Sequence, residues 1–91
     1  MTHDLKCWPG PFQATMDGRK TFEWRKDDRD YNEGDTLLLR EWDPTPVLHC
    51  SATGYTKRTL AMRVTYVLRG RFDVPPGYVI MAIQFVPEGG A

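Results

Sequence analysis

The residues best suited to chemistry lie together in one short segment, residues 18–25. Gly18 and Lys20 are followed by Glu23 and Arg25, which stand two residues apart. Residues two apart in an extended strand share a face, so the carboxylate and the guanidinium lie side by side, with Lys20 at the mouth of the same cleft. An arginine held by a carboxylate keeps N–H donors for a phosphate or a base edge. By spacing alone, an ion pair on a solvated strand face is the favoured interpretation; the alternative is an anion or nucleobase site.

A second group of cations follows later in the chain. The 91 residues hold 12 basic and 12 acidic side chains, which argues against a domain that coats nucleic acid non-specifically. Residues 1–56 carry 7 basic and 10 acidic residues, whereas residues 57–91 carry 5 and 2. The five late cations are Lys57, Arg58, Arg63, Arg69 and Arg71. They predict a local basic face, with Lys57 and Arg58 in a phosphate-binding rim, unless the acids at 27, 28 and 30 pair with them.

Soft metal ligands are few and poorly spaced. They are Cys7, Cys50, His3 and His49, and they form no zinc-binding pattern, so we expect no metal and no cofactor, and reduced thiols. The longest apolar run is well short of the ~18 residues that span a bilayer. The first residues lack the layout of a secretory signal. The sequence therefore predicts a cytoplasmic protein that makes no contact with a membrane.

The elements that must position these residues are short strands and one helix. Alternation and turn signals predict strands near residues 3–6, 21–25, 36–42, 59–68 and 79–86, and a short helix ahead of Gly18 with Pro11 in its first turn. Phe22 and Trp24 are predicted to be core residues, and Tyr66 to share the face of its apolar neighbours. We predict one α+β, β-dominated domain over residues 1–91, a small barrel with one N-terminal helix and a disordered tail at 87–91.

The segment Gly18-x-Lys20-x-x-Glu23-x-Arg25 matches the G-x-K-x-x-E-x-R signature of ASCH domains (activating-signal-cointegrator homology), small barrels of the PUA-like superfamily. The chain resembles in particular a compact ASCH-related family of uncharacterised bacterial and phage proteins, over residues 3–85. The further matching segments are Trp8-Pro9-x-Pro11-Phe12, Gly34-Asp35, Leu39-Arg40-Glu41-Trp42-Asp43-Pro44, Tyr55-Thr56, Val64-Thr65-Tyr66-Val67 and Gly77-Tyr78-Val79-Ile80-Met81.

The resemblance implies a PUA-like pseudobarrel with a cleft between helix and barrel, in which relatives are proposed to bind RNA or modified nucleosides. By that similarity Lys20, Glu23 and Arg25 are the cleft residues. Aromatic side chains stack on bases in some members of the superfamily. The candidates here are Trp42 first, then Trp8, Tyr55 and Tyr66. The favoured function is thus binding of RNA, a nucleotide or a modified base.

Two other classes of function stay open. Some ASCH proteins resemble amidohydrolases acting on acylated cytidine, or show ribonuclease activity; Lys20, Thr21 and Glu23 would then carry catalysis. The expected threonine nucleophile falls at position 23, where this chain has glutamate, so we favour binding over catalysis. The third hypothesis is a protein-interaction module of phage or bacterial origin. It predicts an exposed apolar patch around Trp8 or Trp42 without a basic rim. The sequence does not indicate an oligomeric state.

Overall fold

Five strands and one helix make up the fold of the described residues. A computed structural model describes residues 1–45, 54–70 and 73–86. The elements are β1 (Thr2–Cys7), α1 (Pro9–Met16), β2 (Phe22–Lys26), β3 (Thr36–Trp42), β4 (Tyr55–Arg69) and β5 (Tyr78–Phe85). Each lies where a strand or helix was predicted, although β4 begins at residue 55 rather than 59. His49, Cys50, Arg71 and the tail 87–91 lie outside the described residues.

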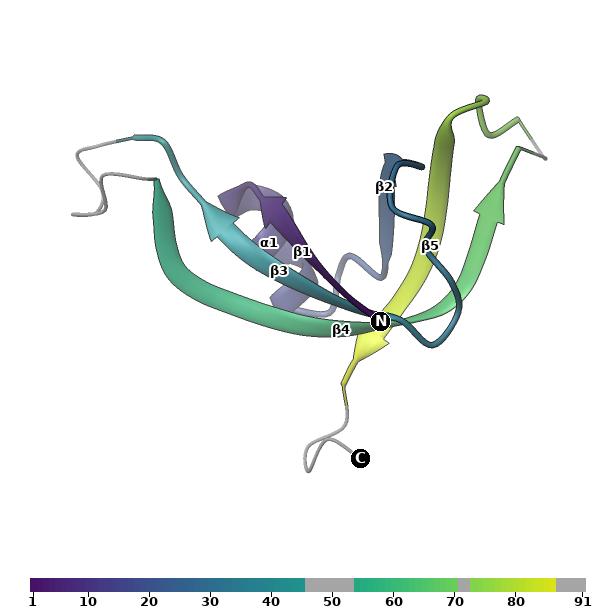
Figure 1. Ribbon diagram of the computed structural model, residues 1–91. Coiled ribbons are helices and arrows are strands. Elements are labelled where there is room, and N and C mark those ends of the chain that lie inside the picture. Colours follow the sequence, from purple (N-terminus) through teal and green to yellow (C-terminus); the bar gives the residue numbers. More distant parts are fainter. Residues whose placement is uncertain (46–53, 71–72, 87–91) are drawn as a thin grey trace.

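The strands form a single curled sheet in the order β1-β3-β4-β5-β2. β1 runs parallel to β3, and the other neighbours are antiparallel. β4 extends over 15 residues and curves along the base of the sheet, so that β1 and β3 form one arm and β5 and β2 the other (Figure 1). The register shifts between residues 40 and 42 and between residues 64 and 66, and such bulges bend a strand and increase its twist. The predicted α+β, β-dominated class is confirmed, as a half-barrel.

The two edge strands do not pair with each other. In the described residues β1 pairs with β3 alone, and β2 with β5 alone. Two arginines span the opening between these edges instead. Arg25 Nη2 donates to the Lys6 carbonyl at 2.9 Å, and Arg29 Nη1 donates to the Asp4 carbonyl at 2.6 Å. The barrel is therefore held at this side by side chains rather than by a strand ladder.

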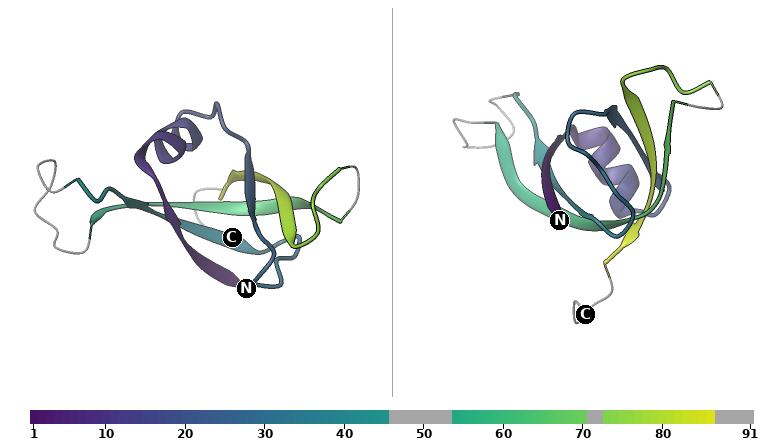
Figure 2. Two further views of the ribbon diagram at one scale, coloured as in Figure 1. Left: turned by 90° about the horizontal axis from the view of Figure 1, so that it is seen from above. Right: turned by 45° about the vertical axis from the view of Figure 1, so that its right-hand side comes forward.

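The core lies on the concave side of the sheet, and α1 packs at one end of the curl (Figure 2). Phe12 of α1 is fully buried, and Thr15 returns its hydroxyl to the Pro11 carbonyl within the same helix. The buried strand residues around them are Leu5, Leu37, Leu39, Met62, Val64, Val79, Met81 and Ile83. Packing of Phe12 against these strands fixes the helix and, with it, the turn that leads to β2.

The face of β2 that was predicted to point to solvent points inward, and the face that was predicted to be buried is exposed. Phe22 and Trp24 are 48% and 52% exposed, whereas Glu23 between them is only 3% exposed. The expectation that Phe22 and Trp24 belong to the core is wrong. Alternation separates the two faces of a strand but does not say which one points inward. Here the inward position belongs to a carboxylate because two cations accompany it.

In β4 a bulge likewise exchanges the side chains that point inward with those that point to solvent. Tyr66, predicted to share the face of Val64, is 56% exposed, and Val67 packs against the core in its place. The register shift between residues 64 and 66 adds a residue to the strand, which turns the following side chains over. β5 is paired on both edges, and its fully buried residues, Val79 and Met81, lie on one face.

Candidate functional site

The turn after α1 places Lys20 beside the start of β2. Gly18 has φ +82°, a conformation that glycine adopts without strain. The N–H groups of Arg19 and Lys20 both donate to the Ala14 carbonyl, at 2.9 and 3.0 Å, and so close the helix C-terminus. The glycine of the signature is thus a helix-ending residue, which brings Lys20 back toward the strand that carries Glu23.

The Glu23 carboxylate is held between two cations. Lys20 Nζ donates to Oε1 at 2.6 Å, and Arg25 Nε donates to Oε2 at 2.9 Å. The Glu23 side chain is 4% exposed, while those of Lys20 and Arg25 are 19% and 25% exposed. Charge-assisted bonds of this kind are short and strong, and burial weakens their screening by salt. Lys20, Glu23 and Arg25 therefore form one fixed cluster, as the spacing predicted.

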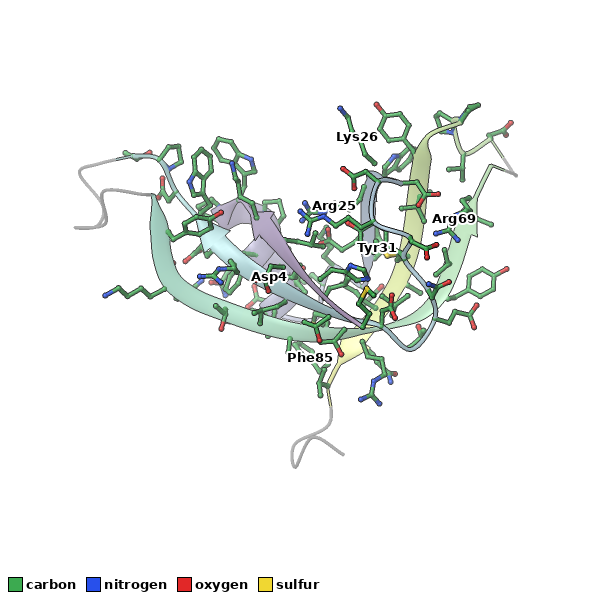
Figure 3. The ribbon with its side chains drawn as sticks, viewed as in Figure 1. Asp4, Arg25, Lys26, Tyr31, Arg69 and Phe85 are labelled. Atoms are coloured by element: carbon green, nitrogen blue, oxygen red, sulfur yellow. The ribbon has the colours of Figure 1, made fainter. Side chains whose placement is uncertain are left out.

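This cluster lines a cavity of about 480 Å³ between β1 with the start of α1 and the edge strand β2. We call it the β1–β2 cavity. Its lining residues are Lys6, Cys7, Trp8, Pro11, Lys20, Phe22, Glu23, Trp24 and Arg25. Arg25 projects from β2 into the space between the two arms of the sheet (Figure 3). The volume falls within the range of about 300–1,000 Å³ typical of small-molecule sites.

The β1–β2 cavity is positively charged and rich in donors. Lys6, Lys20 and Arg25 face it together with a single carboxylate, that of Glu23. Lys20 uses two of its donors, on Glu23 and the Phe22 carbonyl, and Arg25 uses two, on Glu23 and the Lys6 carbonyl. An ammonium has three N–H groups and a guanidinium five, so both cations retain donors for a ligand.

Aromatic side chains form the walls of the same cavity. Trp8 and Trp24 line it and are 55% and 52% exposed, so both side chains are accessible to a ligand. Trp42 does not line it but supports Trp8 edge to face, with ring centroids 4.9 Å apart. Lys6 Nζ lies 4.1 Å from the centroid of Trp42. Trp42 was the first of the predicted stacking candidates. Trp24 was not among them, because the alternating pattern of its strand predicted that Trp24 belongs to the core.

Cys7 lies at the base of the cavity, next to two carboxylates. Its side chain is 3% exposed, and Glu41 is its register partner on β3. Burial, together with the charges of Glu23 and Glu41, raises the pKa of the Cys7 thiol to about 11, although Arg25 and Lys20 act in the opposite direction. A thiol in this environment stays protonated and is a poor nucleophile.

Arg58 is occupied elsewhere. Its Nε and Nη2 donate to the two oxygens of Glu41 at 2.9 and 3.2 Å, and its guanidinium carbon lies 5.0 Å from the ring centroid of Phe12. Thr56 adds a third bond to Glu41, at 2.7 Å. These contacts tie β4 to β3 and α1. Lys57 is exposed, with φ +73°, and neither Lys57 nor Arg58 lines the β1–β2 cavity. Their assignment to a phosphate rim stays a prediction.

The remaining candidates lie apart from the cluster. Arg69 binds Asp27 at 2.6 and 3.2 Å, which is the alternative left open for the late cations. Thr21, the catalytic alternative, is exposed and is not among the residues that line the cavity. Tyr55 lies beneath Arg40, 5.4 Å from ring centroid to guanidinium carbon. His3 Nε2 donates to the Asp35 carboxylate at 2.8 Å.

The described residues contain neither a metal-binding cluster nor a helix that could cross a membrane. Over residues 1–45, 54–70 and 73–86, no group of three or more histidine, cysteine, aspartate or glutamate side chains is placed to hold a metal ion. The single described helix is too short to cross a membrane.

Comparison with known proteins gives a family but no activity. An uncharacterised 12.9 kDa protein encoded in the GpA 3′ region of Escherichia phage P2 is 45% identical over 40 residues. That alignment covers 44% of this chain and 37% of the phage protein, so the shared part is well under half of the relative. A family model matches residues 2–83, which include every strand except the last residues of β5. The chain belongs to the family described as a domain of unknown function, DUF3850.

Proposed function

We propose that the β1–β2 cavity binds a nucleobase, presented by RNA or by a free or modified nucleotide. The observation that carries the proposal is the Glu23 carboxylate, buried and clamped by Lys20 and Arg25 at the wall of an aromatic-lined cavity. Burying charged groups costs desolvation free energy, and buried charge clusters that face a cavity are found more often at functional sites. The burial of Glu23 beside an open cavity therefore favours a ligand-binding role over a structural ion pair.

The polar groups suit the edge of a base. A carboxylate accepts from an exocyclic amine or a ring N–H, while the remaining N–H groups of Lys20 and Arg25 donate to base carbonyls or ring nitrogens. Because Lys20 and Arg25 hold Glu23 at 2.6 and 2.9 Å, the acceptor is fixed before a ligand arrives. Fixing it in advance reduces the entropy lost on binding.

The aromatic groups suit the faces of a base. Trp8 and Trp24 come from opposite sides of the β1–β2 cavity and each is about half exposed. Stacking of a base on an aromatic ring contributes about 1–3 kcal/mol. Lys6 near Trp42 and Lys20 near Phe22 give this aromatic surface a basic rim, at 4.1 and 5.0 Å from the ring centroids. Within the described residues, the aromatic surface at Trp8 and Trp42 is thus accompanied by cations, which favours a nucleotide ligand over the apolar patch expected of an interaction module.

The balanced charge of the chain indicates a short ligand. With 12 basic and 12 acidic residues, long-range attraction to a nucleic-acid backbone is small. Recognition must then come from one local site. This proposal agrees with the ASCH-like signature Gly18-x-Lys20-x-x-Glu23-x-Arg25, whose residues form the cluster.

The test is a titration of the protein with a mixed-sequence single-stranded RNA of twelve nucleotides, followed by filter binding and by quenching of tryptophan fluorescence. The variant is Lys20→Met/Glu23→Gln/Arg25→Met, which removes the cluster without leaving a buried charge alone. It should weaken binding about tenfold or more. The control Arg63→Met makes the same change in net charge on β4, outside the cavity lining, and should stay within about twofold of the wild type.

Equal loss in both variants would mean that binding follows net charge alone and would refute the proposal. Absence of binding to the RNA and to all four nucleotides would refute it as well. The same protein incubated with acylated cytidine, followed by mass spectrometry, tests the hydrolase alternative. Deacylation that disappears in Lys20→Met would replace the binding function by a catalytic one.

A further inference from the structure

A second cavity adjoins the first on the other side of Arg25. It has a volume of about 210 Å³. Its lining residues are Leu5, Arg25, Lys26, Asp28, Arg29 and Tyr31. Arg25 lines both cavities, so its guanidinium group lies between the two spaces that a ligand could fill. We call this second space the Arg29 cavity.

The charge of the Arg29 cavity is that of an anion site. Three cations, Arg25, Lys26 and Arg29, face it with one carboxylate, that of the exposed Asp28. Arg29 uses Nη1 on the Asp4 carbonyl at 2.6 Å, which fixes the guanidinium in place. Its Nε and Nη2 have no hydrogen-bond partner among the described residues. Arginine presents such groups as a planar fork that matches the oxygens of a phosphate.

A tyrosine hydroxyl opens into the same cavity. Tyr31 is 1% exposed as a whole residue, and it lines the Arg29 cavity. Among the described residues no fully buried side-chain nitrogen or oxygen lacks a hydrogen-bond partner, so the Tyr31 hydroxyl, which has no protein partner there, is accessible from the cavity. Burial raises the pKa of Tyr31, whereas the nearby charges of Arg29 and Arg25 lower it, so the hydroxyl is protonated at neutral pH and close to both guanidinium groups. It is a donor that lines a cationic space and has no acceptor.

We infer that the Arg29 cavity is a phosphate subsite, filled by a phosphate ester attached to the sugar of the base that occupies the β1–β2 cavity. Arg25, Arg29 and the Tyr31 hydroxyl donate to the phosphate oxygens. This inference rests on the proposed function, because it needs a base in the first cavity. It deepens that function, since it makes the ligand a nucleotide or a phosphodiester rather than a free base or nucleoside.

The two cavities suit the two parts of such a ligand. A nucleotide carries its base and its phosphate on one sugar, and the aromatic walls lie on the side of Trp8 and Trp24 while the Arg29 cavity is lined by charged and hydroxyl groups. Arg25 would contact both parts from its position between them. The same guanidinium bridges β2 to the Lys6 carbonyl, so ligand binding and the connection of the two sheet edges share one residue.

The test compares four nucleosides, their 5′-monophosphates and a dinucleoside monophosphate by fluorescence titration of the wild type and two variants. The variants are Arg29→Met and Tyr31→Phe; the second removes only the hydroxyl. In the wild type, the phosphorylated form of the best-bound base should bind about tenfold or more tightly than its nucleoside. In Arg29→Met that advantage, which is the ratio of two affinities measured in the same variant, should fall to about twofold or less.

Each result supports or overturns the inference. Preference for the monophosphate over the dinucleoside monophosphate identifies a free nucleotide as the ligand, and the reverse preference identifies RNA; both support the subsite. Nucleosides that bind as well as their monophosphates would overturn the subsite and leave the base site intact. A phosphate advantage retained in both variants would also overturn it. If no nucleoside or nucleotide binds, the proposed function itself fails, and the subsite with it.

Discussion

Replacing Glu23 by glutamine should destabilise the fold strongly, because it leaves two cations facing each other. The Glu23 side chain is 4% exposed and receives bonds from Lys20 at 2.6 Å and from Arg25 at 2.9 Å. Removing one member of a buried charge cluster costs about 3–5 kcal/mol. Lys20 and Arg25 are 19% and 25% exposed, so water compensates part of this loss. We expect the free energy of unfolding to fall by about 2–4 kcal/mol.

Urea unfolding followed by circular dichroism measures this change directly. For a domain of this size a loss of about 2–4 kcal/mol lowers the melting temperature by roughly 10–30 °C. The companion variant Lys20→Met/Glu23→Gln/Arg25→Met removes all three charges and should recover most of the stability, since neutral groups of similar size replace a buried charge cluster at little net cost.

The pair of variants separates two explanations. If Glu23→Gln unfolds within about 0.5 kcal/mol of the wild type, the cluster behaves as an exposed ion pair, and the argument from its burial is refuted. If the triple variant is as unstable as Glu23→Gln, the loss comes from packing around position 23 rather than from uncompensated charge.

Three further outcomes are expected. Hydrogen bonds from His3, the Asn32 N–H and the N-terminus outweigh burial and lower the pKa of Asp35. The contribution of Asp35 to stability is therefore present above the ordinary carboxyl pKa and is lost as the pH falls through the lower pKa of the folded state. Between about pH 5 and about pH 2, the urea midpoint should fall more in the wild type than in Asp35→Asn. Gly54→Ala should cost about 1–3 kcal/mol in thermal melts, since φ is +89° and an added Cβ would lie 2.6 Å from Trp42 Nε1. The pKa of Cys7 is about 11, so the folded protein holds little thiolate at pH 8. In a Cys50→Ser variant, iodoacetamide should therefore modify Cys7 about a hundredfold more slowly in the folded protein than in the urea-unfolded protein.

The order and type of the elements were predictable because their signals are local. Gly18 ends α1 as expected, with φ +82°, and the alternating segment 36–42 is β3 without change of bounds. The cluster of Lys20, Glu23 and Arg25 was also predictable, since period-two geometry places positions 23 and 25 on one face of any strand. These inferences need no knowledge of what lies on either side of the strand.

Local patterns could not predict which face of each strand is buried. β2 alternates cleanly, yet Phe22 and Trp24 are about half exposed because β2 is an edge strand whose inner face meets a polar cavity. The exposure of Tyr66 depends on a bulge between residues 64 and 66, and no residue in that stretch marks it. Arg29 and Tyr31 come together with Arg25 only because the segment after β2 returns along the sheet opening, a long-range arrangement.

Charge pairing in the fold explains how a neutral chain can have a cationic site. Two of the five late cations are paired with acids from the first half of the chain: Arg58 binds Glu41 and Arg69 binds Asp27. The basic surface suggested by residues 57–71 is thereby reduced. Around Arg25, by contrast, the two cavities together are lined by Lys6, Lys20, Arg25, Lys26 and Arg29 against two carboxylates. Paired acids elsewhere and few acids here concentrate positive charge at the opening of the half-barrel, where a short anionic ligand gains most from it.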